Sequence, residues 1–207
     1  RKAIPHQMKE MEKEGHYSRG PWRGYKFSCY EGGLRVPFAA VWPGVVQPGS
    51  VSDSPISLID LKATWADIAD IELSPEHAPD SISFLPYLKN QEILARNHLV
   101  AQGTRADAYY EGNWKLVLGP GSGSSGGHFT EPKSEDAWKE ALVEFGRKPK
   151  NHKELEDPTF VQLYDLKADP GETKNLAKSH FDQVKKMIRA YAKIVDDGRT
   201  TPGPKLS

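Results

Sequence analysis

The sequence predicts an α/β protein whose chain ends in a smaller α+β subdomain, and three observations support this class. A continuous apolar run followed by an amphipathic helix pattern is typical of a buried strand and its covering helix. Short β-rich runs separated by glycines indicate an antiparallel meander. The last helix pattern carries one wide apolar stripe, and such a helix needs a sheet face to cover.

The first of these features lies in the first half of the chain. Residues 37–42, PFAAVW, lack polar alternation and end at a Pro-Gly pair, which predicts a strand buried on both faces. Residues 57–71, SLIDLKATWADIADI, predict an amphipathic helix, with Ser57 and Asp60 at the spacing of a capping box. Its apolar positions are Leu58, Leu61, Trp65 and Ile68. We expect this stripe to pack on a layer that the chain does not contain.

The second half predicts the α+β subdomain. Four strands are expected, at residues near 98–103, 107–111, 113–118 and 161–165, and they form an antiparallel sheet. A helix over residues 180–196, ended by Gly198, is expected to cover that sheet. Between the third and fourth strands, composition predicts a flexible loop over 119–133 and then a helix from Ser134.

Composition excludes several classes of function. The 28 basic and 28 acidic residues give zero net charge, so no basic field is present to bind a nucleic acid. No apolar run approaches the roughly 18 residues that a membrane-spanning helix needs. The seven histidines include no pair at i, i+4, and the single cysteine excludes a disulfide framework and a cysteine-based zinc site, so no metal site is predicted.

Lys26 is the strongest candidate functional residue that the sequence itself offers. A lysine in a loop is usually a solvated charge, but Tyr25 and Phe27 flank this one and nearby glycines permit close approach of the backbone. These features favour an anion site. Cys29 could be a nucleophile, but its aromatic neighbours favour an inert, packed thiol.

Four ordered stretches resemble the type I sulfatases, the arylsulfatase family of the alkaline phosphatase superfamily. Residues 15–44 match the family pattern G-x-K-x-x-x-Y/W-E-G-G-x-R-x-P, and residues 162–177 match L-Y-D-L-x-x-D-P-x-E-x-x-N-L. The helix at 57–71 and the turn at 80–86 resemble family elements that lie between these patterns. On this resemblance, residues 1–93 are the C-terminal part of the α/β catalytic domain and residues 94–207 the C-terminal α+β subdomain.

The resemblance implies hydrolysis of sulfate esters. In the family, a formylglycine made from the Cys or Ser of a C/S-x-P-x-R motif attacks sulfur, and a calcium ion polarises the sulfate oxygens. Lys26 matches the family lysine that contacts the sulfate and the bridging oxygen, and His16 matches a histidine of bacterial members that lines the same pocket. The resemblance therefore implies a catalytic Lys26 and a substrate site formed by His16 and Lys26.

The chain departs from the family pattern in what it lacks. It has no C/S-x-P-x-R motif, so Cys29 is not the formylglycine precursor, and the acidic calcium ligands of the family are missing. Since Arg1 is not a methionine, we expect the chain to be a C-terminal piece of a longer sulfatase. By itself it is expected to bind no calcium and to be inactive, its partner being the missing N-terminal catalytic part.

Other interpretations remain open at this stage. The complete protein could hydrolyse phosphate or phosphonate esters, which would require two metal centres, or the chain could be a non-catalytic module that binds sulfated glycans. The substrate of a sulfatase could be an aryl or a carbohydrate sulfate, because the loops that set specificity vary freely. The residues leave the cellular location unknown, and the resemblance implies a periplasmic or secreted bacterial protein.

Overall fold

A computed structural model describes residues 10, 11, 13–17, 19–91, 96–103, 106–119 and 161–206. They form two compact units, each assembled from segments that are distant in sequence. The described residues of the first unit lie within 1–35, 101–108 and 113–184, and those of the second within 36–100, 109–112 and 185–207. The units do not test the predicted division after residue 93, which stays a prediction.

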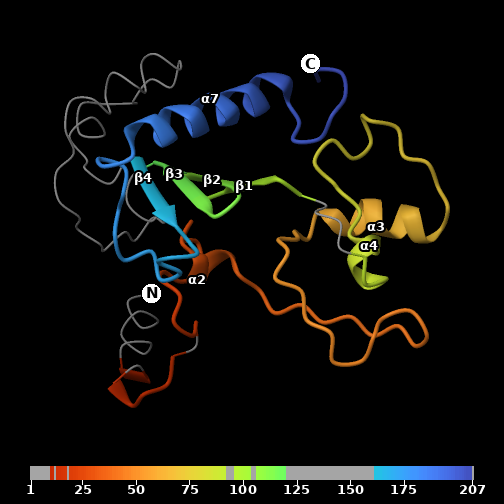
Figure 1. Cartoon of the computed structure of the whole chain (residues 1–207), viewed down its shortest axis with the longest axis horizontal. Helices are drawn as coiled ribbons and strands as arrows, with labels where there is room; N and C mark the ends of the chain where they lie inside the picture. The colour runs from red at the N-terminus through yellow and green to blue at the C-terminus, as the bar shows by residue number, and fades with distance from the viewer. Residues whose placement is uncertain are drawn as a thin grey trace. The chain divides into compact units, whose positions relative to one another are not determined.

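A four-stranded antiparallel sheet in the order β1-β2-β3-β4 is the main β element, as the sequence predicted (Figure 1). Its strands are β1 (His98–Gln102), β2 (Asp107–Glu111), β3 (Trp114–Leu118) and β4 (Val161–Asp165). In the antiparallel register of β3 and β4, Lys115 lies opposite Tyr164 and Leu116 opposite Leu163. All four of these side chains are fully shielded from solvent, so β3 is buried on both faces.

Helix α7 (Phe181–Asp197) contacts the strands, which confirms the second half of the prediction (Figure 1). The Tyr191 ring lies 6.3 Å from the Tyr109 ring of β2, and His180, next to the helix start, lies 5.3 Å from Trp114 of β3. The stripe that the sequence showed supplies the buried residues of the helix, Val184, Met187, Ile188 and Tyr191. Gly198 ends the helix at a φ of 69°, a conformation that favours glycine.

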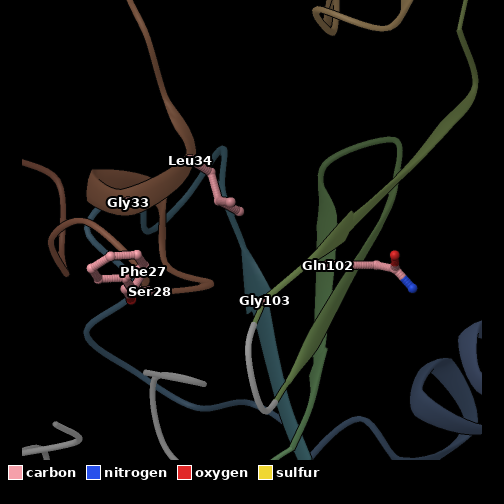
Figure 2. Close-up of a pocket in the computed structure, with 6 residues that line it drawn as sticks. All are labelled: Phe27, Ser28, Gly33, Leu34, Gln102 and Gly103. Carbon is pink, nitrogen blue, oxygen red and sulfur yellow. The ribbon is translucent and has the colours of Figure 1, made fainter. Parts of the chain in front are cut away.

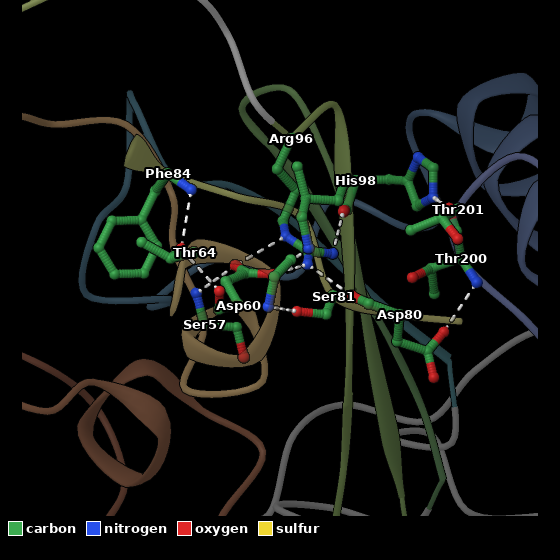
Figure 3. Close-up of polar contacts among 12 residues, drawn as sticks. Ser57, Asp60, Thr64, Asp80, Ser81, Phe84, Arg96, His98, Thr200 and Thr201 are labelled. Atoms are coloured by element: carbon green, nitrogen blue, oxygen red, sulfur yellow. Dashed lines mark hydrogen bonds and ion pairs between the residues drawn. The ribbon is translucent and has the colours of Figure 1, made fainter. Parts of the chain in front are cut away.

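In the second unit, Asp60 links two short helices and the segments near them (Figure 3). It begins α3 (Asp60–Ile68), and its carboxylate forms a buried ion pair with Arg96. The same carboxylate accepts the backbone N–H groups of Ser57 at 2.8 Å and Ile82 at 2.9 Å. Asp60 therefore joins the segment before α3 to the segment that leads into α4 (Leu85–Leu88).

Two predictions for the first half need correction. The helix expected over 57–71 spans only Asp60–Ile68. One half of the predicted capping box is present, because the Asp60 carboxylate accepts the Ser57 N–H, but no side chain caps the first N–H groups of α3. The expected strand at 37–42 is wrong, since these residues form no regular element and Val41 is 91% exposed. A strand buried on both faces needs neighbouring strands, and the described residues offer none to this segment.

Within the described residues, no helix is long and apolar enough to cross a membrane. The flexible loop predicted at 119–133 and the helix predicted from Ser134 lie outside the described residues, apart from Gly119.

Candidate functional site

Lys26 lies in a β-turn of the first unit. The N–H of Ser28 donates to the carbonyl of Tyr25 at 2.9 Å, which places Lys26 and Phe27 at the two central positions. Phe27 has a φ of 73°, a conformation that phenylalanine rarely adopts. The Lys26 ammonium is exposed and lies 5.2 Å from the centre of the Phe27 ring, within the range of a cation–π contact.

An open pocket of about 370 Å³ adjoins this turn. Phe27, Ser28, Gly33, Leu34, Gln102 and Gly103 line it (Figure 2). Figure 2 shows Phe27 and Ser28 beside the helical turn that carries Gly33, with the end of β1 across the pocket. The pocket has an exposed aromatic residue next to a cation, which suits an anionic, partly apolar ligand, whereas the Gln102 amide points away from Phe27 (Figure 2).

The glycine pair of the family pattern lies in α2 (Glu31–Leu34), which packs directly on the turn. A Cβ atom on Gly33 would lie 2.5 Å from the Tyr25 carbonyl oxygen and 2.4 Å from that of Ser28. A Cβ atom on Gly32 would lie 2.6 Å from the Arg23 carbonyl oxygen. Both contacts are with backbone, so only glycine permits this approach of α2 to the segment that carries Lys26.

Behind α2 lies a buried charge cluster, which we define as Glu31, Lys115 and Glu172. The Lys115 Nζ atom lies 2.9 Å from Glu31 Oε1 and 2.7 Å from Glu172 Oε1. The other Glu172 oxygen accepts the Glu31 backbone N–H at 2.6 Å. All three side chains are almost completely shielded from solvent, so the pairing offsets a large desolvation cost.

Charge is not balanced inside the cluster, because one lysine faces two carboxylates. Burial raises the pKa of Glu172 above its ordinary value, and the neighbouring Lys115 opposes that shift only in part. The Lys115 Nζ atom is close enough to Glu172 Oε1 to form an ion pair, but the geometry at Oε1 is not that of a hydrogen bond. The second oxygen of Glu31 finds a further cation in Arg35, at 2.6 Å.

Aromatic and amide groups surround the cluster in the first unit. Arg23 donates to the Glu172 carbonyl at 2.7 Å and to the Tyr164 hydroxyl at 3.1 Å, and its guanidinium lies 4.1 Å from the centre of the Tyr30 ring. The hydroxyls of Tyr30 and Tyr164 both donate to the Gln162 side-chain oxygen, at 2.6 and 2.7 Å. The first family pattern is thereby joined to strand β4 of the late pattern.

The polar residues of the late pattern build the turn that presents Glu172. Asp165 and Asp169 accept backbone N–H groups of the turn, among them Lys167 at 3.0 Å and Lys174 at 2.8 Å. The side chain of Asn175 accepts the N–H of Leu163 and donates to the carbonyl of Val161. Glu172 itself has a φ of 53°, which this network of hydrogen bonds stabilises. The late pattern is thus a structural one in this chain.

The structure places the three candidate residues in different environments. Lys26 is exposed, and its ammonium pairs with no carboxylate among the described residues. His16 is also exposed, and its backbone N–H donates to the Met11 carbonyl at 2.9 Å. No hydrogen bond joins His16 to Lys26 within the described part of the chain, so their shared role in a substrate site stays a prediction.

Cys29 is buried, as the sequence favoured. Its thiol donates to the Ala106 carbonyl at 3.0 Å, and burial raises its pKa to about 11. A thiol with such a pKa is almost entirely protonated at neutral pH and is a poor nucleophile. The described residues support the inert role for Cys29.

Sequence reasoning missed the buried charge cluster. Glu31 and Glu172 belong to the two family patterns, but Lys115 lies in strand β3, outside both patterns. The signal that could have found it is the run Leu116–Leu118, because three consecutive apolar residues indicate a strand covered on both faces. A lysine in such a strand must be paired.

The described residues contain no group of three His, Cys, Asp or Glu side chains that could hold a metal ion. The calcium ion that the resemblance implies therefore has no ligand set in this part of the protein. Lys26 is an exposed cation beside the pocket that Phe27 lines.

Individual relatives, and not a family model, show which family the chain belongs to. No family model matches the sequence. An N-acetylgalactosamine-6-O-sulfatase of Bacteroides thetaiotaomicron is 33% identical over 174 residues, which is 84% of this chain and 30% of the relative. Human arylsulfatase D is 26% identical over 205 residues, which is 93% of this chain and 33% of the relative.

A solved structure agrees with these relatives. It comes from work on the metabolism of multiple glycosaminoglycans by Bacteroides thetaiotaomicron, is 28% identical and superposes with a TM-score of 0.65. The match covers 89% of this chain and 34% of that structure. The chain is therefore a homologue of the sulfatases over most of its length and corresponds to the C-terminal portion of a sulfatase. It spans about a third of the length of these relatives.

Proposed function

We propose that this chain is the C-terminal portion of an enzyme that hydrolyses sulfate esters, with Lys26 as the residue that contacts the sulfate. The observation that carries the proposal is a contrast within the first family pattern. Tyr30, Glu31 and Arg35 all have partners inside the first unit. The Lys26 ammonium instead projects from a strained turn beside an open pocket.

The chemistry of the reaction explains why a cation belongs there. Negative charge accumulates on the sulfate and on the leaving oxygen when the ester bond breaks, and a fixed cation stabilises that charge. Lysine supplies a compact point charge, and the exposed position leaves the ammonium accessible to substrate. The formylglycine and the calcium ion of the family mechanism would be provided by residues outside the described part of the chain.

The substrate class that we propose is a sulfated carbohydrate. The Bacteroides relative is named for a sulfate on N-acetylgalactosamine, and the pocket beside Lys26 offers the exposed Phe27 to a ligand. An aromatic side chain suits the apolar face of a sugar ring. An aryl sulfate is the alternative, and the human relative is named as an arylsulfatase.

The test uses the complete protein that contains this chain. We expect turnover of a chromogenic sulfate ester and of N-acetylgalactosamine 6-sulfate, and none of the corresponding phosphate esters. Lys26→Ala should lower kcat several hundredfold, about 2.7 to 4 kcal/mol, the size of the effect of deleting one oxyanion-hole donor. Lys26→Arg should not restore the rate, because a planar guanidinium does not reproduce a compact charge.

Lys167→Ala is the matched control, since Lys167 is also an exposed turn lysine of the first unit. It should change neither turnover nor melting temperature. Near-normal turnover by a folded Lys26→Ala enzyme would exclude the proposed role of Lys26. Preferential turnover of phosphate esters would favour the phosphatase alternative. We expect the 207-residue chain alone to hydrolyse no sulfate ester.

A further inference from the structure

We propose that the buried charge cluster of Glu31, Lys115 and Glu172 is a positioning unit that fixes the turn of residues 25–28, and with it the Lys26 ammonium. The effect on turnover rests on the function proposed above, whereas the effect on the turn does not. None of the three side chains reaches the surface, so their role in catalysis would be to act through Lys26 and not to touch substrate.

The first step of the argument is the attachment of α2 to the cluster. Glu31, the first residue of this helix, is held by its side chain through Lys115 and by its backbone N–H through Glu172. A helix of four residues has almost no stability of its own. The position of α2 is therefore set by these contacts and by the packing of its glycines.

The second step is the contact between α2 and the turn. Gly33 approaches the carbonyl groups of Tyr25 and Ser28 so closely that a methyl group would not fit between them. The same two residues close the turn through the Ser28 N–H to Tyr25 hydrogen bond. A displacement of α2 would therefore change the two residues that define the position of Lys26.

The third step is that the turn needs external support. Phe27 adopts a positive φ, which is unfavourable for a residue with a large side chain. Its ring is 65% exposed, so burial of the side chain does not compensate for the strain. Strained backbone of this kind persists where the surroundings over-determine it, and it is concentrated at functional sites.

A purely stabilising role for the cluster is the competing explanation. Buried ion pairs are weak evidence for stability, because apolar side chains of similar volume often stabilise a protein as well or better. Charged groups do, however, impose a defined geometry through short directional contacts. The two explanations predict different results when the cluster is replaced and the protein keeps its overall stability. A positioning role predicts that the turn of residues 25–28 loosens, and a purely stabilising role predicts that it does not.

The first experiment measures the turn directly in the complete protein. Removing Lys115 alone leaves the buried Glu172 carboxylate without a cation, whereas Glu31 keeps Arg35. The variant is therefore Lys115→Met/Glu172→Gln, which removes one charge of each sign. We expect the amide of Ser28 to exchange its hydrogen about tenfold faster or more, at an almost unchanged melting temperature. The control is Asp60→Asn/Arg96→Met, which removes an equally buried ion pair from the second unit and should leave Ser28 exchange unchanged.

The second experiment is a double-mutant cycle on turnover. Combined with the native Lys26, the Lys115→Met/Glu172→Gln change should lower kcat about thirtyfold with little change in KM. In a Lys26→Ala background it should lower kcat less than about twofold, because a misplaced turn no longer carries the cation. Full activity of a Lys115→Met/Glu172→Gln enzyme with a loosened turn would contradict the link to turnover.

The outcomes separate the two proposals. Unchanged exchange at Ser28 in the folded variant would overturn the positioning role, as would equal losses of kcat in both backgrounds. Faster exchange at Ser28 combined with a silent Lys26→Ala would support the cluster as the support of the turn and would overturn the function proposed for Lys26.

Discussion

The Lys115 ammonium lies 2.7 Å from the Glu172 carboxylate, and both side chains are shielded completely from solvent. Lys115 belongs to strand β3, whereas Glu172 belongs to the turn after β4. Glu31 of the first family pattern joins the same pair. Two stretches that resemble sulfatases in sequence therefore meet in space, and most of their polar residues hold one another instead of facing a ligand. Within the first family pattern Lys26 differs from Glu31, because its charge remains at the surface.

The first prediction concerns the pH dependence of stability. Burial raises the folded-state pKa of Glu172 above the ordinary value of 4.5, so folding favours the protonated carboxyl. The stabilising contribution is complete below pH 4.5 and is lost as pH rises through the folded-state pKa. The Glu172→Gln variant has no carboxyl group to titrate at this position. As pH rises above 4.5, the melting temperature of the variant should therefore fall less than that of the native protein.

Thermal melts between pH 4 and pH 8 test this prediction. Glu76→Gln is the control, because Glu76 is exposed and, among the described residues, its carboxylate accepts from the Ser74 hydroxyl alone. It should follow the native curve. Parallel curves for Glu172→Gln and the native protein would contradict the assigned titration of Glu172.

The second prediction concerns the contact between α2 and the turn. Gly33→Ala places a methyl group within 2.5 Å of two backbone carbonyl oxygens, and neither can move without moving the turn. Overpacking of this kind costs about 1 to 3 kcal/mol, which for a protein of this size lowers the melting temperature by several degrees.

Gly171→Ala is the matched control for Gly33→Ala. A Cβ atom there would meet its nearest neighbour, a Thr173 methyl carbon, at an ordinary 3.5 Å. We expect a change of less than about 0.5 kcal/mol in the free energy of unfolding. Equal stability of the two alanine variants would show that α2 does not press on the turn.

Much of the fold was readable from the sequence because local patterns decide it. The strands follow short β-rich runs bounded by glycine, and α7 follows its own apolar stripe, so both were predicted to within a residue or two. The strand expected at 37–42 was wrong because a strand depends on its neighbours. The pattern showed an apolar run but could not show whether partners lay within the chain.

The site was only partly readable for a similar reason. The resemblance identified Lys26, but nothing in the letters indicates that Phe27 adopts a positive φ, since that conformation is imposed by the contacts around it. The run Leu116–Leu118 indicates that Lys115 is buried, but it does not indicate which residues pair with it. Its partners Glu31 and Glu172 are distant in sequence, and such contacts cannot be inferred from the spacing of residues along one chain.

The third prediction tests the strain at Phe27. Asparagine tolerates positive φ better than other non-glycine residues, and the exposed ring of Phe27 contributes little burial. Phe27→Asn should therefore raise the free energy of unfolding by about 0.5 to 1 kcal/mol. Tyr17→Asn, at an exposed aromatic residue without a positive φ, should give no such gain. Denaturant unfolding of both variants provides the measurement, and a loss of stability in Phe27→Asn would contradict the prediction.

The fourth prediction concerns the reactivity of Cys29. With a pKa of about 11, on the order of one thiol in a thousand is ionised at pH 8, and the group is buried as well. The folded protein should therefore resist alkylation by iodoacetamide at pH 8 and react only after denaturant is added. Mass spectrometry of a tryptic digest follows the modification. Rapid labelling of the folded protein at Cys29 would contradict the inert role.

The last prediction concerns the apolar residues that the second unit leaves exposed. Trp65 of α3 is 64% exposed, although it belongs to the stripe that the sequence predicted to face a packed layer. The other exposed residues near this stripe are Leu58, Ile59, Ile68 and Ile71. Since the chain spans only about a third of its relatives, we expect the remaining part of the sulfatase to cover this stripe.

The isolated 207-residue chain should therefore self-associate and bind an apolar dye, and Leu58→Gln/Trp65→Gln should reduce both effects. Removing two large apolar side chains from an exposed surface lowers the driving force for association without creating a cavity. Val195→Gln is the control, because Val195 is an exposed apolar residue of α7 that lies outside the stripe. Sedimentation velocity measures the association. A monomeric chain that binds no dye would contradict this prediction. The apolar residues of the α3 stripe would then be shielded from solvent by contacts within the chain.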